Sequence, residues 1–307
     1  DPDFSQPYNQ LGYALRFVGD YDGAEEAFQR YTELIPDQPN PYDSYGELLM
    51  KMGRYDESIA SYEKALAIDP KFVASYVGIG TNQMFMGQFE AARASFSKVT
   101  ENARNDGERR QARFWTAASY LHQRDSEKAF DEVQKMYEIA AETDDRGAMA
   151  GDLNLMGHIY LRAGRTDEAA EKYRAQIDMM RTSDVTEEIK EATERNHLYD
   201  LARIAIWQAD LNTAKELADT YRLEVAAHNI RFEVQRTHEL DGMIEYGRKV
   251  VNILVEDDTA VGVVTEDGMK YYADMVISAA ERLRCSTLAA LITRMPVPSS
   301  STRRCRR

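Results

Sequence analysis

A repeat of 34 residues runs through the first third of this chain and constrains its fold more than any other feature. Six sets of residues recur in one register, which is very unlikely to arise by chance. The sets are Pro2, Pro36 and Pro70; Tyr8, Tyr42 and Tyr76; Gly12, Gly46 and Gly80; Gly19, Gly53 and Gly87; Tyr21, Tyr55 and Phe89; and Phe28, Tyr62 and Phe96. A period of this length indicates units that bury their apolar faces against their neighbours. The sequence therefore predicts a stacked array of repeats.

Each repeat is predicted to contain two helices. Apolar residues at helical spacing within 8–15 form one face of a first helix, and those within 24–31 form the stripe of a second. The sequence from Gly19 breaks the pattern between them, and Pro36 ends the repeat because proline cannot continue a helix. Gly12 lies near the middle of the first helix, where glycine costs about 1 kcal/mol relative to alanine. We therefore expect a neighbouring helix to approach closely at Gly12.

This pattern resembles the tetratricopeptide repeat, which has aromatic, Leu-Gly, large apolar, alanine, aromatic and proline positions at these offsets. The residues that carry the resemblance are Tyr8, Leu11, Gly12, Leu15, Ala24, Phe28 and Pro36 in the first repeat; Tyr42, Tyr45, Gly46, Leu49, Ser58, Tyr62, Ala65 and Pro70 in the second; and Tyr76, Ile79, Gly80, Ala92 and Phe96 in the third. The resemblance implies an all-α fold, a superhelix (α-solenoid) of six to seven helix pairs. We expect a small C-terminal β-meander and a disordered tail to follow it.

The repeat array is expected to cover residues 1–242. Its repeats are placed near residues 5–38, 39–72, 73–106, 110–143, 150–183 and 195–228, with a partial one at 229–242. A polar insert around Asn102–Gly107 shifts the fourth repeat by three residues. Asp1-Pro2 falls where a preceding repeat would end, so we expect the chain to start at a repeat boundary, with its native N-terminus missing.

The sequence changes character in residues 243–280. Three runs rich in β-branched and apolar residues, at 250–255, 260–264 and 275–280, are separated by turn residues and predict a β-meander. The stretch from about 248 to 280 resembles part of the flavin-dependent carotenoid desaturases and amine oxidases. The resemblance implies that Val250 matches a position whose backbone approaches the adenine of FAD.

The phosphate-binding turn of that flavoprotein family is missing. A G-x-G-x-x-G motif occurs nowhere in the chain, and the nearest fragment, Gly78-Ile-Gly80, belongs to a repeat helix. Without this turn no helix N-terminus faces a pyrophosphate. We therefore predict no bound cofactor and no cofactor-binding residues, with Val250 only a family remnant. An inactive fragment of an FAD-dependent oxidoreductase, fused to the repeats, remains the alternative function.

Residues 281–307 differ from the rest of the chain in charge and composition. They hold seven arginines and one acid, a charge of 7 − 1 = +6. Because the net charge of the chain is −14, residues 1–280 carry −14 − 6 = −20. Both cysteines also lie there. We expect this stretch to be a disordered basic tail, and we interpret the chain as a chimeric or frameshifted product. A decayed gene product without a function of its own, or a natural fusion that lost its cofactor site, are further alternatives.

The sequence contains no recognisable catalytic motif, so we predict a protein that is not an enzyme. The five histidines show no metal-ligand pairing and no Gly-x-Ser-x-Gly motif occurs, so we predict neither a catalytic nor a metal site. The net charge of −14 argues against nucleic-acid binding. We expect no membrane span, because the sequence contains no apolar run of about 18 residues, and we also expect no signal peptide. The compartment stays open, with the cytoplasm as the default.

The remaining candidate is the concave face that the first helices of the repeats form in this family. The residues predicted to line it and bind a partner are Asn9, Tyr13, Arg16, Phe17, Asp43, Glu47, Met50, Lys51, Val77, Thr81, Met84 and Phe85. Family members that capture the acidic C-terminal tail of a chaperone use Lys, Asn and Arg here, whereas this chain has Asp43 and Glu47. We therefore predict a non-catalytic scaffold whose partner is a protein or peptide with apolar and basic residues, and not an acidic chaperone tail.

Overall fold

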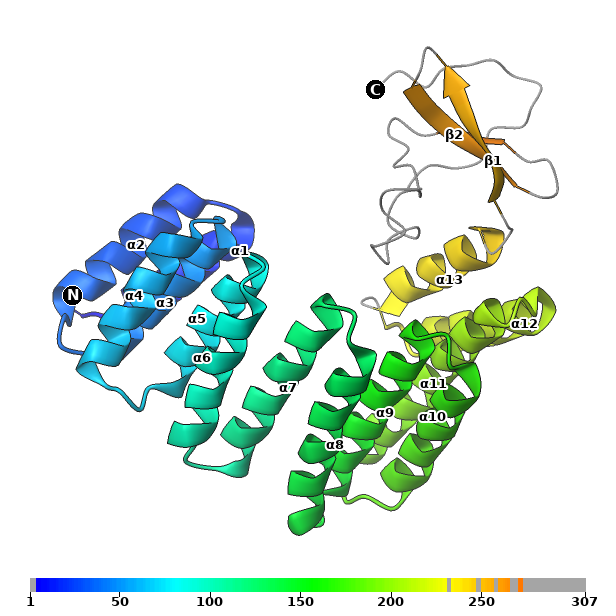
Figure 1. Cartoon of the computed structure of the whole chain (residues 1–307), viewed down its shortest axis with the longest axis horizontal. Coiled ribbons are helices and arrows are strands. Elements are labelled where there is room, and N and C mark those ends of the chain that lie inside the picture. The colour runs from blue at the N-terminus through cyan, green and yellow to red at the C-terminus, as the bar shows by residue number, and fades with distance from the viewer. Residues whose placement is uncertain (1–3, 231–232, 247–249, 257–258, 266–269, 273–307) are drawn as a thin grey trace. The chain divides into compact units, whose positions relative to one another are not determined.

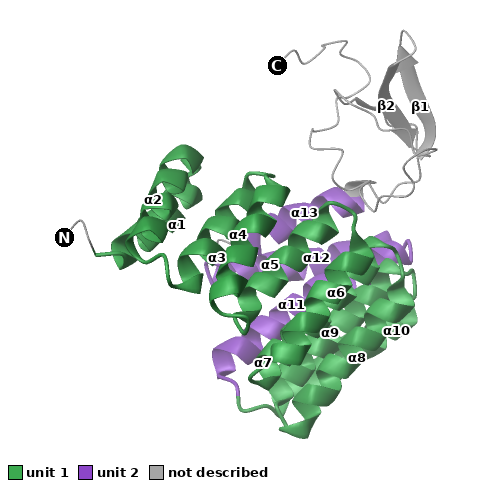
Figure 2. Cartoon of the chain, turned by 60° about the vertical axis from the view of Figure 1, so that its left-hand side comes forward, with its two compact units in different colours: residues 1–184 green, residues 185–307 purple. Residues whose placement is uncertain are grey.

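The computed structural model describes residues 4–230, 233–246, 250–256, 259–265 and 270–272. The chain divides into two compact units, residues 1–184 and residues 185–307 (Figure 2). The boundary falls between the fifth and sixth predicted repeats, so the predicted array of residues 1–242 spans both units. The predicted basic tail, residues 281–307, lies outside the described residues.

The first unit consists of five helix pairs (Figure 1). Its helices are α1 (Gln6–Val18), α2 (Tyr21–Leu34), α3 (Pro39–Lys51), α4 (Tyr55–Ile68), α5 (Val73–Phe85), α6 (Phe89–Asn102), α7 (Asp106–His122), α8 (Ser126–Glu142), α9 (Arg146–Arg162) and α10 (Thr166–Arg181). Each pair packs against the next along the chain. The predicted helix pairs and their order are thus confirmed.

Residues in the left-handed region connect the two helices of each repeat. Gly53, at φ +75°, has no atom near the position of an added Cβ, so only its backbone conformation favours glycine there. Gly19, Gly87 and Gly164 have the same conformation, whereas the fourth and sixth repeats place Arg124 and Ala209 there, at φ 63° and 60°. The turn is therefore kept in every repeat, although two repeats lack its preferred residue.

The close approach predicted at Gly12 is confirmed, and its partner is an aromatic ring of the following helix. A Cβ at Gly12 would lie 2.7 Å from Cζ of Phe28, which is fully buried. Gly46 faces Tyr62 at 3.0 Å in the same way. The fourth repeat has Ala117 at the glycine position, and the core cluster around it contains Val133 at the aromatic position. A larger residue on the first helix thus accompanies a smaller one on the second.

The helices of the later repeats start earlier than the sequence predicted. Helices α7 and α9 begin at residues 106 and 146, ahead of the predicted repeat starts at 110 and 150. The side chains of Asn105 and Asp145 cap them by accepting hydrogen bonds from the backbone N–H groups of Glu108 and Ala148, both at 2.9 Å. These caps allow about one more helical turn than the first three repeats have.

The second unit contains α11 (Glu187–Trp207), α12 (Leu211–Ala227) and α13 (Val234–Tyr246), which contact one another. The sixth repeat therefore begins eight residues before its predicted start at 195. A buried ion pair joins α11 to the residue just before α13: Arg195 Nε donates to Glu233 Oε2 at 2.9 Å, and Tyr221 OH donates to the same oxygen at 3.1 Å. Periodicity did not predict this contact.

Three strands follow the helices: β1 (Val250–Glu256), β2 (Thr259–Thr265) and β3 (Lys270–Tyr272). They form an antiparallel sheet in the order β1-β2-β3, in which Ile253 pairs with Val263 and Gly262 with Tyr272. The first two strands coincide with predicted runs. The third lies at 270–272, ahead of the predicted run at 275–280, which falls outside the described residues.

Candidate partner-binding surface

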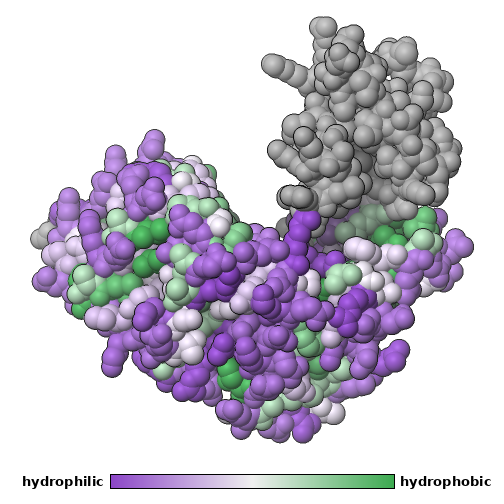
Figure 3. Space-filling view, viewed as in Figure 1, coloured by the Kyte–Doolittle hydropathy of each residue, from purple (hydrophilic) through white to green (hydrophobic). Residues whose placement is uncertain are grey.

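The first four odd-numbered helices of the first unit form one continuous surface. Helix α1 contacts α3, α3 contacts α5, and α5 contacts α7, in addition to the packing of each helix against its own partner. We call the surface of α1, α3, α5 and α7 the inner surface. Figure 3 shows that the described residues facing the viewer are mainly hydrophilic, with hydrophobic residues in small patches.

Hydrogen bonds on the inner surface join predicted site residues of the first two repeats. Tyr13 OH donates to Glu47 Oε2 at 3.1 Å, and Arg16 Nη1 lies 2.5 Å from Glu47 Oε1. The Arg16 guanidinium also lies 4.9 Å from the centre of the Tyr13 ring. Glu47 thus has both a cation and a phenol as partners, so its charge is largely compensated within the chain. Burial is the main cause that raises the pKa of Tyr13 to about 12.

Asp43 lies one helical turn before Glu47 and has a different environment. Ser75 Oγ, from the next odd-numbered helix, donates to Asp43 Oδ1 at 2.7 Å. Burial raises the pKa of Asp43 to about 6; the hydrogen bond from Ser75 opposes this rise, and the nearby Glu47 adds to it. No cationic side chain forms an ion pair with Asp43 among the described residues. The inner surface therefore has a half-buried carboxyl group without a counter-ion.

The other predicted site residues divide by exposure. Phe17 and Phe85 are exposed, at 91% and 51%, and Lys51 is exposed as well. Asn9, Met50 and Val77 are half-buried. Thr81 and Met84 are buried, and Met84 belongs to a core cluster that includes Trp115 of α7. The structure therefore brings most of the predicted residues to one surface but leaves Thr81 and Met84 beneath it.

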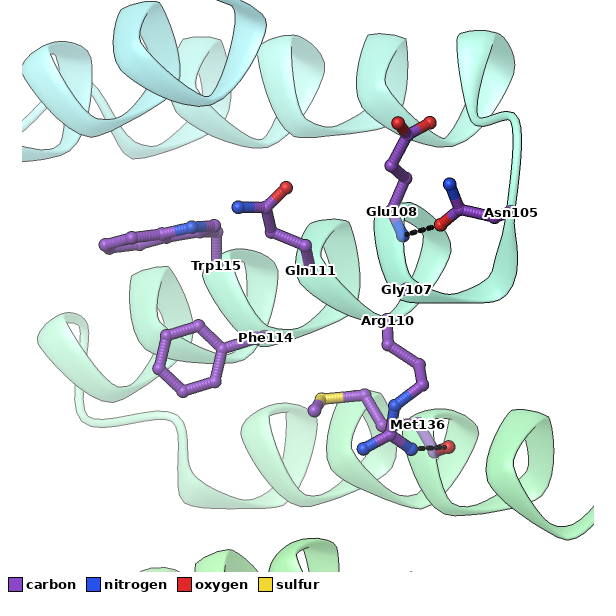
Figure 4. Close-up of a pocket in the computed structure, with 8 residues that line it drawn as sticks. All are labelled: Asn105, Gly107, Glu108, Arg110, Gln111, Phe114, Trp115 and Met136. Carbon is purple, nitrogen blue, oxygen red and sulfur yellow. Dashed lines mark hydrogen bonds between the residues drawn. The ribbon is translucent and has the colours of Figure 1, made fainter. Parts of the chain in front are cut away.

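A pocket of about 620 Å³ lies along α7, and the sequence-based site residues did not include it (Figure 4). Its lining residues are Asn105, Gly107, Glu108, Arg110, Gln111, Phe114, Trp115 and Met136. Phe114 and Trp115 lie at one end, and Asn105 and Glu108 at the other, with Gln111 between them. Aligning the repeats on the left-handed turn residues Gly19 and Arg124 puts Phe114 at the position of Asn9. Extending the predicted register to the fourth repeat would therefore have included Phe114 among the predicted site residues.

A buried ion pair fixes the pocket-lining Arg110. Its guanidinium donates to Asp152 of α9 at 2.6 and 3.0 Å, and to the backbone oxygen of Met136 at 2.7 Å. The Asp152 side chain is only 3% exposed. The bidentate pair ties α7 to α9, and the hydrogen bond to Met136 ties α7 to α8.

The part of the chain that the structure describes has neither a metal-binding cluster nor a membrane-spanning helix. It contains no group of three or more His, Cys, Asp or Glu residues that could hold a metal ion. Within the same residues, no helix combines the length and apolar character that a bilayer crossing requires.

Paired helices packed in sequence define an α-solenoid, the class of protein that the fold indicates. Three tetratricopeptide-repeat family models match the sequence, over residues 9–71, 49–113 and 153–184. Residues 9–113 and 153–184 are therefore tetratricopeptide repeats, as the spacing predicted. None of these matches reaches the flavoprotein-like stretch at 248–280, so that resemblance gains no support.

Solved structures of other proteins have a similar fold. A structure of PilW, described as a widely conserved type IV pilus biogenesis factor, is 14% identical, with 75% of this chain and 96% of that chain covered and a TM-score of 0.52. The Cut9–Hcn1 complex of the APC/C is 12% identical, with 80% of this chain and 43% of that chain covered and a TM-score of 0.52. At these identities the likeness shows the fold alone. No curated protein matches the sequence.

Proposed function

We propose that this protein is a non-catalytic scaffold that binds a peptide or partner protein on the inner surface. The supporting observation is the continuity of that surface: successive odd-numbered helices contact one another and carry predicted site residues side by side. Extended surfaces of stacked repeats suit recognition of elongated partners.

The charges of the inner surface favour a partner with basic and apolar residues. Glu47 is already paired with Arg16, so it adds little net charge. Asp43 is the acid that lacks a cation, and the exposed rings of Phe17 and Phe85 offer apolar contact. A lysine or arginine of the partner beside Asp43 would supply the missing counter-ion and favour the ionised carboxylate. A carboxylate of an acidic chaperone tail would instead meet like charge.

Selection of random peptides from a display library against the full chain tests this proposal. We expect the selected peptides to be enriched in basic and apolar residues and to bind less tightly to the Asp43→Asn variant. The matched control is Asp56→Asn, which changes an exposed acid on the even-numbered helix α4. Selected peptides that are acidic, or that lose equal affinity with both variants, would contradict the proposal.

A further inference from the structure

The pocket along α7 has an aromatic end and a polar end. Trp115 is half-buried and stacks on Phe96 with a centroid distance of 6.3 Å, while Phe114 meets Trp115 edge to face at 5.5 Å. Phe114 is nevertheless 41% exposed. Burying such a ring under a ligand gains about 25 cal/mol per Å² of apolar area. A volume of about 620 Å³ lies within the range of about 300–1,000 Å³ that small-ligand sites occupy.

The charged groups of this pocket are all satisfied within the chain. Arg110 is held by Asp152, as described above. Glu108 accepts hydrogen bonds from the guanidinium and the backbone N–H of Arg104, at 2.6 and 2.7 Å, which lower its pKa below the usual range. A charged ligand group would therefore find no free counter-ion among the lining residues and would lose its hydration on entry. This compensation favours an uncharged occupant.

The side-chain amide of Gln111 can bind the main chain of a peptide ligand. Gln111 is exposed, and its amide makes no hydrogen bond among the described residues. A glutamine amide both donates and accepts, so it matches the N–H and C=O groups of an extended peptide. In Figure 4 this amide lies between the aromatic end of the pocket and its polar end.

We infer that the α7 pocket binds one uncharged apolar side chain of a peptide whose main chain pairs with Gln111. This inference rests on the proposed function and names the fourth repeat as the place where the partner anchors an aromatic or large aliphatic residue. It differs from the predicted site, whose residues all lie in the first three repeats. The basic residue that faces Asp43 and the apolar anchor are then two separate contacts of one extended partner.

Tryptophan fluorescence tests the inference, because the chain has two tryptophans and one of them lines the pocket. In the full chain with Trp207→Phe, Trp115 is the single reporter. The probes are blocked pentapeptides in which glycines flank a central leucine, phenylalanine, lysine or glutamate. We expect saturable changes with leucine and phenylalanine at concentrations of about 1–10 mM, since one anchor gives roughly millimolar affinity. Lysine and glutamate should give none.

Variants locate the site. Phe114→Ala and the exposed change Gln111→Ala should each weaken binding about fivefold to tenfold. Phe4→Ala removes an exposed ring that lies outside both the pocket and the predicted site, so it should leave binding unchanged. Circular dichroism establishes that each variant is folded, and the Gln111 variant serves if the Phe114 variant is not. Equal responses to charged peptides, no saturable response, or no effect of the pocket variants would overturn the inference. If display-selected peptides bind the inner surface but ignore Phe114→Ala and Gln111→Ala, the inference fails while the proposed function stands.

Discussion

The size match between Gly12 and Phe28 predicts that Gly12→Ala destabilises the first repeat when Phe28 is present and stabilises it when Phe28 is replaced by a smaller residue. An alanine Cβ at residue 12 would lie 2.7 Å from the Phe28 ring, whereas ordinary contact begins at 3.4 Å, so the ring must move by 3.4 − 2.7 = 0.7 Å. Phe28 is fully buried and also meets Tyr13 edge to face at 5.2 Å, which leaves little room. Such overpacking costs about 1–3 kcal/mol, and the better helix propensity of alanine returns about 1 kcal/mol. Gly12→Ala should therefore lower the local free energy of unfolding by about 1 kcal/mol.

The variant Phe28→Val removes the ring and recreates the pair seen at Ala117 and Val133. In that background Gly12→Ala no longer clashes, so it should raise stability by about 1 kcal/mol, which makes the coupling energy roughly 2 kcal/mol. Because the stability of a repeat array is nearly a sum over repeats, hydrogen exchange of the α1 and α2 amides is the appropriate measurement. An equal effect of Gly12→Ala in both backgrounds would refute the packing argument.

Three further predictions test other parts of the structure. Ala209→Gly should stabilise the sixth repeat by about 1 kcal/mol and Gly53→Ala should destabilise the second by a similar amount, because a positive φ strains alanine but not glycine. Shifts in thermal unfolding that are absent or opposite in sign would contradict this. For Asp43, a folded pKa near 6 against an ordinary value of 3.8 means that the folded state holds its proton more tightly. Wild type should therefore lose up to about 3 kcal/mol relative to Asp43→Asn as the pH rises from 4 to 7, and a pH-independent difference in urea unfolding would show otherwise. Arg195→Leu should destabilise the second unit by about 3–5 kcal/mol because it leaves Glu233 buried and unpaired, and the double variant with Glu233→Leu should recover much of this loss.

The sequence was sufficient for the repeat architecture because the determining contacts are local. Gly12 and Phe28 lie on the two helices of one repeat, and the same pair recurs every 34 residues, so periodicity carries the information. The longer helices of the later repeats were missed because Asn105 and Asp145 act as caps only once the chain before them has turned.

The candidate site was only partly predictable for a different reason. The register assigned Met84 to the inner surface, but its burial depends on how closely Trp115 and the rest of α7 pack against it. The ion pairs of Arg110 and Arg195 join residues 42 and 38 positions apart, which no repeat spacing signals. Such contacts depend on how neighbouring repeats settle against one another.

We propose that the inner surface of the first unit binds the partner. Hydrogen exchange of the full chain, with and without a peptide selected by display, tests it directly. We predict added protection in α1, α3, α5 and α7, with little change in α2, α4 and α6. Protection confined to the even-numbered helices, or to residues 185–307, would contradict the claim.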